Sequence, residues 1–314
     1  MVEDAAAFSL IARLMGGSLC THSLTVPLDR ALTALLVALG FAVDANVEDA
    51  PARQTWEFHD RLFQRATRSY DDLIVRGGTY RFASKWPAPP AIRPAYAGTS
   101  ISLSHQPAPS SPSSGHALHE VMESRRSLRA MSEQPVDLEV IGQLLHRVAR
   151  IKAVLPETTK IAQETMLRPY PSAGAVHELE FYLAVRSCAG LTPGFYHYRG
   201  QQHALTQIAG AEAPAAAMLA DCAKAWGQPD RPPQVLVVIA SRLPRIAWKY
   251  AGIAYRLSLM NAGVAIQSLH LAATDLGLAG SAAGSGHPDH FAQATGVCSW
   301  EETSIAEFGF GRME

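Results

Sequence analysis

The chain has 314 residues, of which 48% are hydrophobic and 18% are charged. A chain of this length and apolar content can bury the core of one large or two ordinary domains, which excludes a largely disordered protein. Its 27 Lys and Arg residues balance 28 Asp and Glu residues, giving a formal charge of −1. No basic excess therefore points to nucleic acid as a partner.

The spacing of the cysteines and the charge of the N-terminus indicate in which cellular compartment the protein is expected. The four cysteines, Cys20, Cys188, Cys222 and Cys298, lie far apart and form no CxxC pair. Neither a zinc site nor a disulfide framework is predicted from that spacing. The N-terminus lacks the positive region of a secretory signal, and the most apolar long stretch, residues 253–278, is interrupted by polar and charged side chains. We therefore expect a cytoplasmic protein without a membrane partner.

The first part of the chain has helical periodicity. Apolar residues recur at helical spacing over residues 5–15 and 28–39, Gly40 ends the second run, and residues 56–63 indicate a third helix. We predict a small helical domain over residues 1–86, for which a winged-helix-like arrangement is one option.

A Pro/Ser-rich stretch, residues 87–117, follows this domain. It has neither the helical nor the strand period, so we predict a linker or an arm that wraps the rest of the molecule.

The remaining residues, 118–314, are predicted to mix helices and strands in one domain. Helices are expected over residues 119–125, 138–151 and 253–278. Strands are expected over residues 181–185 and 235–240, in a hairpin of residues 194–198 and 203–208, and in a last strand ending at residues 308–310. Because helices and strands do not alternate regularly, the pattern favours an α+β domain over a doubly wound sheet.

Arginine is concentrated at the end of the helix expected over residues 119–125. Arg125, Arg126 and Arg129 lie within six residues, together with Ser127. Planar guanidinium groups suit phosphate, which they bind with paired hydrogen bonds. The same composition is also typical of a solvated helix face, so the segment alone does not decide between the two.

Two further segments are candidates for chemistry. Pro171, Ser172, Ala173 and Gly174 form a proline-fixed turn with side chains small enough for a flat ligand to lie against the backbone, although an ordinary loop has similar composition. The adjacent Lys249 and Tyr250 could transfer a proton. A surface lysine beside a packing tyrosine is the alternative.

The order and spacing of these segments resemble the FMN-dependent azoline dehydrogenases, or SagB-type oxidases, of the nitroreductase superfamily. That family carries Arg-Ser-x-Arg, Tyr-Pro-Ser-Ala-Gly, Lys-Tyr and C-terminal Gly-x-Gly/Pro-Arg motifs. The chain is similar to them at residues 126–129, 170–174, 249–250 and 309–312. Residues 272–284 resemble the tail of the family's long helix and the Gly-rich turn that follows it, and residues 56–60 resemble its N-terminal region.

The resemblance implies a nitroreductase-like α+β fold, with a mainly antiparallel central sheet flanked by helices, and a homodimer that shares its FMN sites. The residues it implies for the phosphate and ribityl groups of FMN are Arg125, Arg126, Ser127, Arg129 and Arg312. Those it implies for the isoalloxazine ring are Pro171, Ser172, Ala173 and Gly174 from the neighbouring subunit, and Gln267, Ala283 and Gly284.

The implied reaction oxidises a thiazoline or oxazoline in a ribosomally made peptide to a thiazole or oxazole, with Lys249 or Tyr250 as the base. The implied partners are a second copy of the chain, the azoline-containing precursor peptide and a cyclodehydratase complex. Two alternatives remain open. One is a flavoenzyme acting on a carrier-bound heterocycle, a nitroaromatic or a quinone, and the other is a non-catalytic subunit that docks a peptide.

Overall fold

In a computed structural model of the chain, the described residues are 10, 24, 26–38, 42, 55–68, 77–104 and 116–314. They fall into two compact units, Met1–Ile74 and Val75–Glu314. Within the described residues, no helix has the length and apolar character that a membrane span requires.

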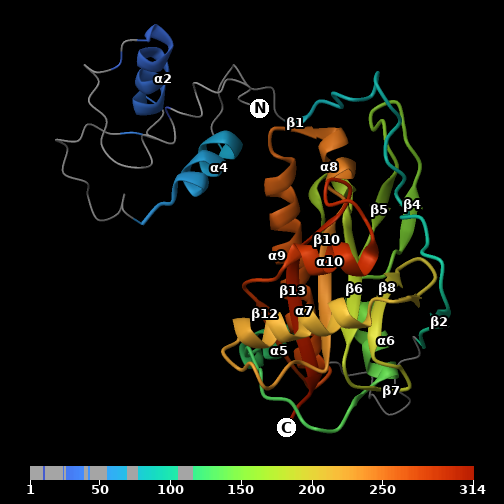
Figure 1. The fold of residues 1–314 in the computed structure, drawn as a ribbon. Coiled ribbons are helices and arrows are strands. Elements are labelled where there is room, and N and C mark those ends of the chain that lie inside the picture. The colour runs from blue at the N-terminus through green and yellow to red at the C-terminus, as the bar shows by residue number, and fades with distance from the viewer. Residues whose placement is uncertain are drawn as a thin grey trace. The chain divides into compact units, whose positions relative to one another are not determined.

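Two helices are described in the first unit, α2 (Pro27–Ala38) and α4 (Phe58–Arg68) (Figure 1). They confirm the second and third helices predicted from apolar spacing. Proline at the first helical position and an acid in the first turn both favour the start of α2. The helix predicted over residues 5–15 lies outside the described residues, apart from Leu10.

The second unit is built on a seven-stranded sheet in the order β12-β13-β10-β6-β8-β9-β2, and each of its pairings is antiparallel. Its strands are β2 (Ser100–Ser102), β6 (Leu179–Val185), β8 (Gly194–Arg199), β9 (Ala204–Ile208), β10 (Val235–Ser241), β12 (Leu278–Ala283) and β13 (Thr303–Arg312). This antiparallel sheet flanked by helices confirms the predicted fold class.

Helices cover both faces of the sheet because successive side chains of the central strand β10 point to opposite faces. Val235, Val237 and Ile239 pack with α6 (Leu138–Val148) and α9 (Ala254–Asp275). The intervening residues of β10 pack with α7 (Glu212–Ala225) and α10 (Pro288–Thr295). Figure 1 shows α7 crossing the strands on its face of the sheet. The whole of β10 is buried, as expected of a continuous Val/Ile strand in a sheet that is covered on both faces.

Shorter elements border the sheet. Helix α5 (Leu118–Ser124) precedes the arginine segment, and helix α8 (Leu243–Lys249) leads directly into β11 (Tyr250–Ala251). The described residues of the unit form three further two-stranded pairings: β1 (Gly77–Gly78) with β11, β3 (Val136–Asp137) with β7 (Cys188–Ala189), and β4 (Ala153–Leu155) with β5 (Thr165–Leu167).

Residues 77–94, which we name the strap, run along α8. Side chains of α8 and of Arg242, the residue before this helix, hold the backbone of the strap: Trp248 Nε1 donates to Trp86 O (3.1 Å), Arg245 Nη1 to Pro89 O (2.8 Å) and Arg242 Nη2 to Pro90 O (3.0 Å). Beyond the strap, β2 adds to the sheet beside β9. The described residues of the expected arm, 87–104 and 116–117, belong to the second unit.

Candidate functional site

The small-residue loop has a strained backbone. Gly174, Ala175 and His177 have φ angles of +57°, +56° and +48°. Residues with a Cβ rarely adopt such angles, because the side chain approaches the following carbonyl at a cost of roughly 1–2 kcal/mol per residue. Such strain persists only where surrounding contacts fix the backbone.

A buried polar network under the loop supplies those contacts. Asn261 of α9 accepts a hydrogen bond from Ala173 N at its Oδ1 (3.1 Å), and its Nδ2 donates to Ser172 Oγ (3.1 Å) and to Glu178 Oε1 (3.0 Å). Glu178 is fully buried and also accepts from Ser258 Oγ (2.8 Å). Sequence reasoning missed Asn261 and Glu178 as site residues, although a polar residue inside an apolar helix pattern is the signal that marks Asn261.

The predicted proton-transfer pair lies against this loop. Lys249 ends α8 and Tyr250 begins β11, so the two residues lie at a change of element. Lys249 Nζ donates a hydrogen bond to Gly174 O (3.1 Å). A Cβ at Gly174 would overlap both Lys249 Nζ and Tyr250 Oη. The structure therefore brings three residues from two separate sequence motifs to one place. The positive φ of Gly174 favours glycine, and a side chain there would displace the ends of Lys249 and Tyr250.

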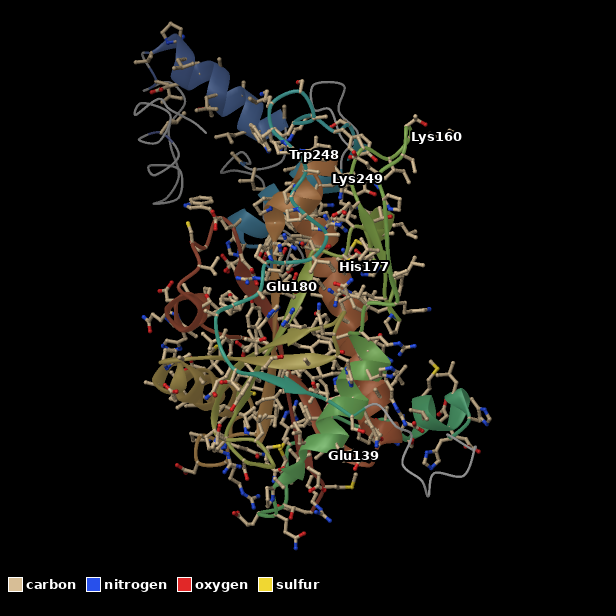
Figure 2. All side chains as sticks on the ribbon, turned by 90° about the vertical axis from the view of Figure 1, so that its right-hand side faces the viewer. Glu139, Lys160, His177, Glu180, Trp248 and Lys249 are labelled. Atoms are coloured by element: carbon tan, nitrogen blue, oxygen red, sulfur yellow. The ribbon has the colours of Figure 1, made fainter. Side chains whose placement is uncertain are left out.

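Burial changes the acidity of the pair in opposite directions. It lowers the pKa of Lys249, which is only 9% exposed. Burial raises the pKa of Tyr250, and the electrostatic interaction with Tyr80 raises it further. A lowered pKa increases the fraction of lysine present as the free amine, the form that can act as a base, whereas the phenol stays protonated and can donate a hydrogen bond. Figure 2 shows Lys249 beside Trp248 near one end of the second unit.

His177, next to the loop, has a different character. Its side chain is buried, burial lowers its pKa to about 3, and its ring packs on Tyr170 at 5.2 Å between centroids. The imidazole is therefore neutral at ordinary pH, as expected of a structural histidine.

The arginine segment lies along the ends of β12 and β13. Leu128 N donates to Gly280 O (3.1 Å), and Ser132 N donates to Arg312 O (2.9 Å). Leu128 therefore lies beside β12 and Ser132 lies beside Arg312 on the neighbouring strand β13, so the chain that follows the arginine segment approaches Arg312. Ser127 is exposed on this segment.

The guanidinium groups of this segment have different neighbours. Arg126 Nη1 donates to the carbonyls of Glu123 and Arg125, at the end of α5. The charge of Arg125 reaches His270 of α9 and, after burial, lowers its pKa. Within the described residues, Arg125, Arg129 and Arg312 form no ion pair with a carboxylate. Their chemistry therefore fits a phosphate group.

A cavity of about 190 Å³ lies at the turn after β12. The predicted ring-edge residues Ala283 and Gly284 line it, with Tyr255 of α9 and Glu307 of β13. Burial, followed by the charge of Asp221, raises the pKa of Glu307 to about 7. Gln267 lies elsewhere, on an exposed position of α9.

The loop and the arginine segment lie near different positions along helix α9. Asn261 contacts the loop and His270 lies near Arg125, so with the rise of an α-helix they are separated by roughly 13 Å along the helix axis. One chain therefore does not bring Ser172 or Gly174 against the phosphate-binding candidates.

Residues 122–312 of this chain match the Nitroreductase family. A putative nitroreductase of Methanocaldococcus jannaschii is 27% identical over 161 residues, which are 51% of this chain and 75% of that protein. A solved putative nitroreductase of Ralstonia eutropha has a TM-score of 0.51 at 19% identity, over 73% of this chain and 99% of that chain.

A chain of the E. coli microcin synthetase McbBCD complex, solved with truncated pro-MccB17 bound, is also similar in structure. Its TM-score is 0.48 at 17% identity, over 89% of this chain and 97% of that chain. A score at that level is a loose likeness and carries no conclusion about activity.

This chain therefore belongs to the nitroreductase family. Its second unit has the α+β fold of that family of flavin-dependent oxidoreductases, and the motifs found in its sequence lie within the matched residues.

Proposed function

We propose that this protein is an FMN-dependent azoline dehydrogenase, which oxidises thiazoline or oxazoline rings of a ribosomally made peptide to thiazoles or oxazoles. One observation carries the proposal: Lys249, Tyr250 and Gly174 converge in a nitroreductase fold. Oxidation of an azoline ring requires a base at this place, because a proton must be removed from a ring carbon. Reduction of an acceptor by a nicotinamide requires no such base.

Lys249 is the base in this proposal. Its buried amine, with a lowered pKa, accepts the proton from the ring carbon at Nζ. Tyr250 keeps its proton and donates a hydrogen bond from Oη, which orients the ring. A bound FMN supplies the acceptor for the hydride equivalent that leaves the neighbouring carbon, and the ring gains a double bond.

The phosphate of FMN would be held by Arg125, Arg129 and Arg312 beside Ser127. Substituting Arg129 by Ala should weaken FMN binding by about 1–3 kcal/mol, the usual scale for a lost charge-assisted hydrogen bond. Arg81→Ala, an exposed arginine of the strap, is the matched control. FMN titration followed by absorbance measures both. An unchanged affinity in Arg129→Ala would remove this residue from the site, and colourless protein that binds no FMN would contradict the proposal.

A homodimer completes the site in this proposal. The exposed side chains of Tyr255, Leu259, Met260 and Val264 give α9 an apolar stripe. A second copy that packs on this stripe would bring its own loop, residues 171–174, towards Ala283, Gly284 and Gln267 of the first. Such pairing would bring the loop of one subunit close to the phosphate-binding candidates of the other, which are far apart along α9 within one chain.

The substrate and partners follow from the motif resemblance at residues 126–129, 170–174 and 249–250. They are an azoline-containing precursor peptide and the cyclodehydratase that makes its rings. In this proposal the part of residues 1–86 that lies in the first unit docks the peptide or the partner enzyme, residues 87–117 are the arm, and residues 118–314, together with strap residues 77–86, form the catalytic domain. A cytoplasmic location is supported by the dispersed cysteines.

Reduction of a nitroaromatic or quinone is the second candidate, favoured by the 27% identity to the archaeal putative nitroreductase. It predicts oxidation of a reduced nicotinamide with either acceptor, at a rate that Lys249→Ala leaves unchanged. The proposed azoline oxidation instead requires Lys249 and no nicotinamide.

A further inference from the structure

The strap holds the backbone of both predicted catalytic residues. Strand β1 pairs with β11, with Gly78 opposite Tyr250 and Gly77 opposite Ala251. Two residues later, Tyr80 N donates a hydrogen bond to Lys249 O (3.2 Å). The junction between α8 and β11 is therefore fixed from outside by a segment far earlier in the chain.

The ring of Tyr80 lies beside the lysine side chain. Lys249 Nζ is 6.0 Å from the centroid of the Tyr80 ring and 5.5 Å from that of Tyr250. The Tyr80 ring also packs edge-on against Trp248, with centroids 5.6 Å apart at an angle of 71°. Tyr80 and Tyr250 thus flank Lys249.

The backbone of Tyr80 is strained, with a φ of +50°. A bulky residue at such an angle is an outlier, which Gly or Asn would occupy at lower cost. Such a strained backbone persists only where neighbouring contacts fix it, and here those contacts are with the residues around the proposed base.

No carboxylate neutralises Lys249 within the described residues. The groups that face it are Tyr80 of the strap, Tyr250 of β11 and the carbonyl of Gly174 in the loop. Arg245, one turn earlier on α8, directs its guanidinium to backbone carbonyls at residues 89, 164 and 176. Burial alone accounts for the lowered pKa of Lys249.

We propose that Tyr80 is a positioning residue of the active site, whose ring holds Lys249 against Gly174 and keeps water from its amine. What Lys249 does for the substrate rests on the proposed function, whereas the contact with Tyr80 does not. Loss of the ring admits water, and hydration favours the ammonium form over the free amine.

The test compares Tyr80→Ala, Tyr80→Gly and Tyr80→Phe in the full chain loaded with FMN. Glycine removes the ring and tolerates the positive φ, so this variant tests the proposal even if the alanine variant fails to fold. Phenylalanine keeps the ring. Phe82→Ala is the matched control, because Phe82 stacks on Trp86 at 4.4 Å in the same strap.

Two readouts are needed. One is the titration of Lys249, followed by NMR of protein labelled with ¹³C at the lysine ε-carbon and assigned with Lys249→Arg. The other is the pH dependence of thiazoline-peptide oxidation. We expect loss of the ring to raise the pKa of Lys249 by about one unit, so that at a fixed pH below it about tenfold fewer molecules hold the free amine. The acidic limb of the rate profile should move with it, and Tyr80→Phe and Phe82→Ala should match the wild type.

An identical titration of Lys249 in Tyr80→Gly and wild type would overturn the proposal for Tyr80. Failure of the proposed function has a separate signature. Wild-type protein would bind FMN but not oxidise the thiazoline peptide, while the titration of Lys249 would still move in the glycine variant and would support the role of Tyr80.

Discussion

Lys249 and Glu307 are two buried ionisable groups in different positions, one against the loop and the other in the cavity after β12. Burial disfavours the charged form of each, so it lowers the pKa of the amine and raises that of the carboxyl. Lys249 has a hydrogen-bond acceptor in Gly174 O, whereas Glu307 Oε2 has no partner within the described residues. Each shift has a measurable consequence.

Glu307 should make the protein less stable as pH rises. Its pKa is raised from an ordinary 4.5 to about 7, so the folded protein keeps a proton that the unfolded chain releases. The resulting stabilisation is complete below pH 4.5 and is lost as pH rises through 7, by roughly 3 kcal/mol in total. Glu307→Gln, which carries no charge at any pH, should lose less stability than the wild type between pH 5 and pH 8.5.

Urea unfolding at the two pH values measures this difference. Glu301→Gln, a change at an exposed carboxyl six residues earlier, should follow the wild type. Equal losses of stability in Glu307→Gln and wild type would show that Glu307 is not protonated in the folded protein.

Sequence could identify Lys249, Tyr250 and Gly174 as candidates but could not show their contact. The loop and the pair are separated by about 75 residues, and each motif has an ordinary structural explanation when taken alone. The buried polar network could not be predicted from the sequence for a related reason. Glu178 and Asn261 carry no local signal that they are partners, because hydrogen bonding between distant residues is set by the fold.

At the scale of elements, strands rich in β-branched and aromatic residues were predictable and those made of small residues were not. The run Val235–Ser241 has strong strand character and was predicted almost to its ends. Strand β12 has the sequence LAGSAA, with no β-branched or aromatic residue, and gave no strand signal. Strand β2 lies in the Pro/Ser-rich stretch, and its pairing with β9 makes it a strand despite that composition.

One buried arginine links helix α8 to three segments. Arg245 is fully buried and donates to Val176 O (2.9 Å), Pro89 O (2.8 Å) and Glu164 O (2.8 Å). Arg245→Met would fill the volume but leave three carbonyls without a donor, at about 1–3 kcal/mol for each buried unsatisfied group. We expect a loss of about 3 kcal/mol or more in the free energy of unfolding, measured by urea denaturation.

The matched control is Arg147→Met, because Arg147 is 41% exposed and pairs with Asp275 near the surface. Such pairs contribute about 0–1 kcal/mol. A loss below 1 kcal/mol in Arg245→Met would mean that Arg245 does not hold the strap and the loop to α8.

At the scale of the whole molecule, the proposed site needs two copies of the chain. Leu259→Glu combined with Val264→Glu would place charges on the apolar stripe of α9, which should prevent pairing because charges are costly to bury without partners. We expect wild-type protein to sediment as a dimer and the double variant as a monomer with a lower FMN content. Trp300→Glu, at a residue that is 86% exposed, is the control and should remain dimeric.

Sedimentation velocity with detection of flavin absorbance measures mass and FMN content together. A wild-type monomer that carries FMN at micromolar concentration would contradict the shared site. The nitroreductase fold of the chain would be unaffected by that result.

The measurement that tests the central claim most directly is turnover of a thiazoline-containing peptide by FMN-loaded protein, followed as a mass loss of two hydrogens per ring. Wild-type protein should oxidise the ring with oxygen as the final acceptor. Lys249→Ala should keep its FMN and lower the rate by roughly 10²–10⁴-fold, the range for loss of a general base. Tyr250→Phe should keep its FMN and give a smaller loss. Wild-type rates in a flavin-loaded Lys249→Ala, or no oxidation by the flavin-loaded wild type, would contradict the account.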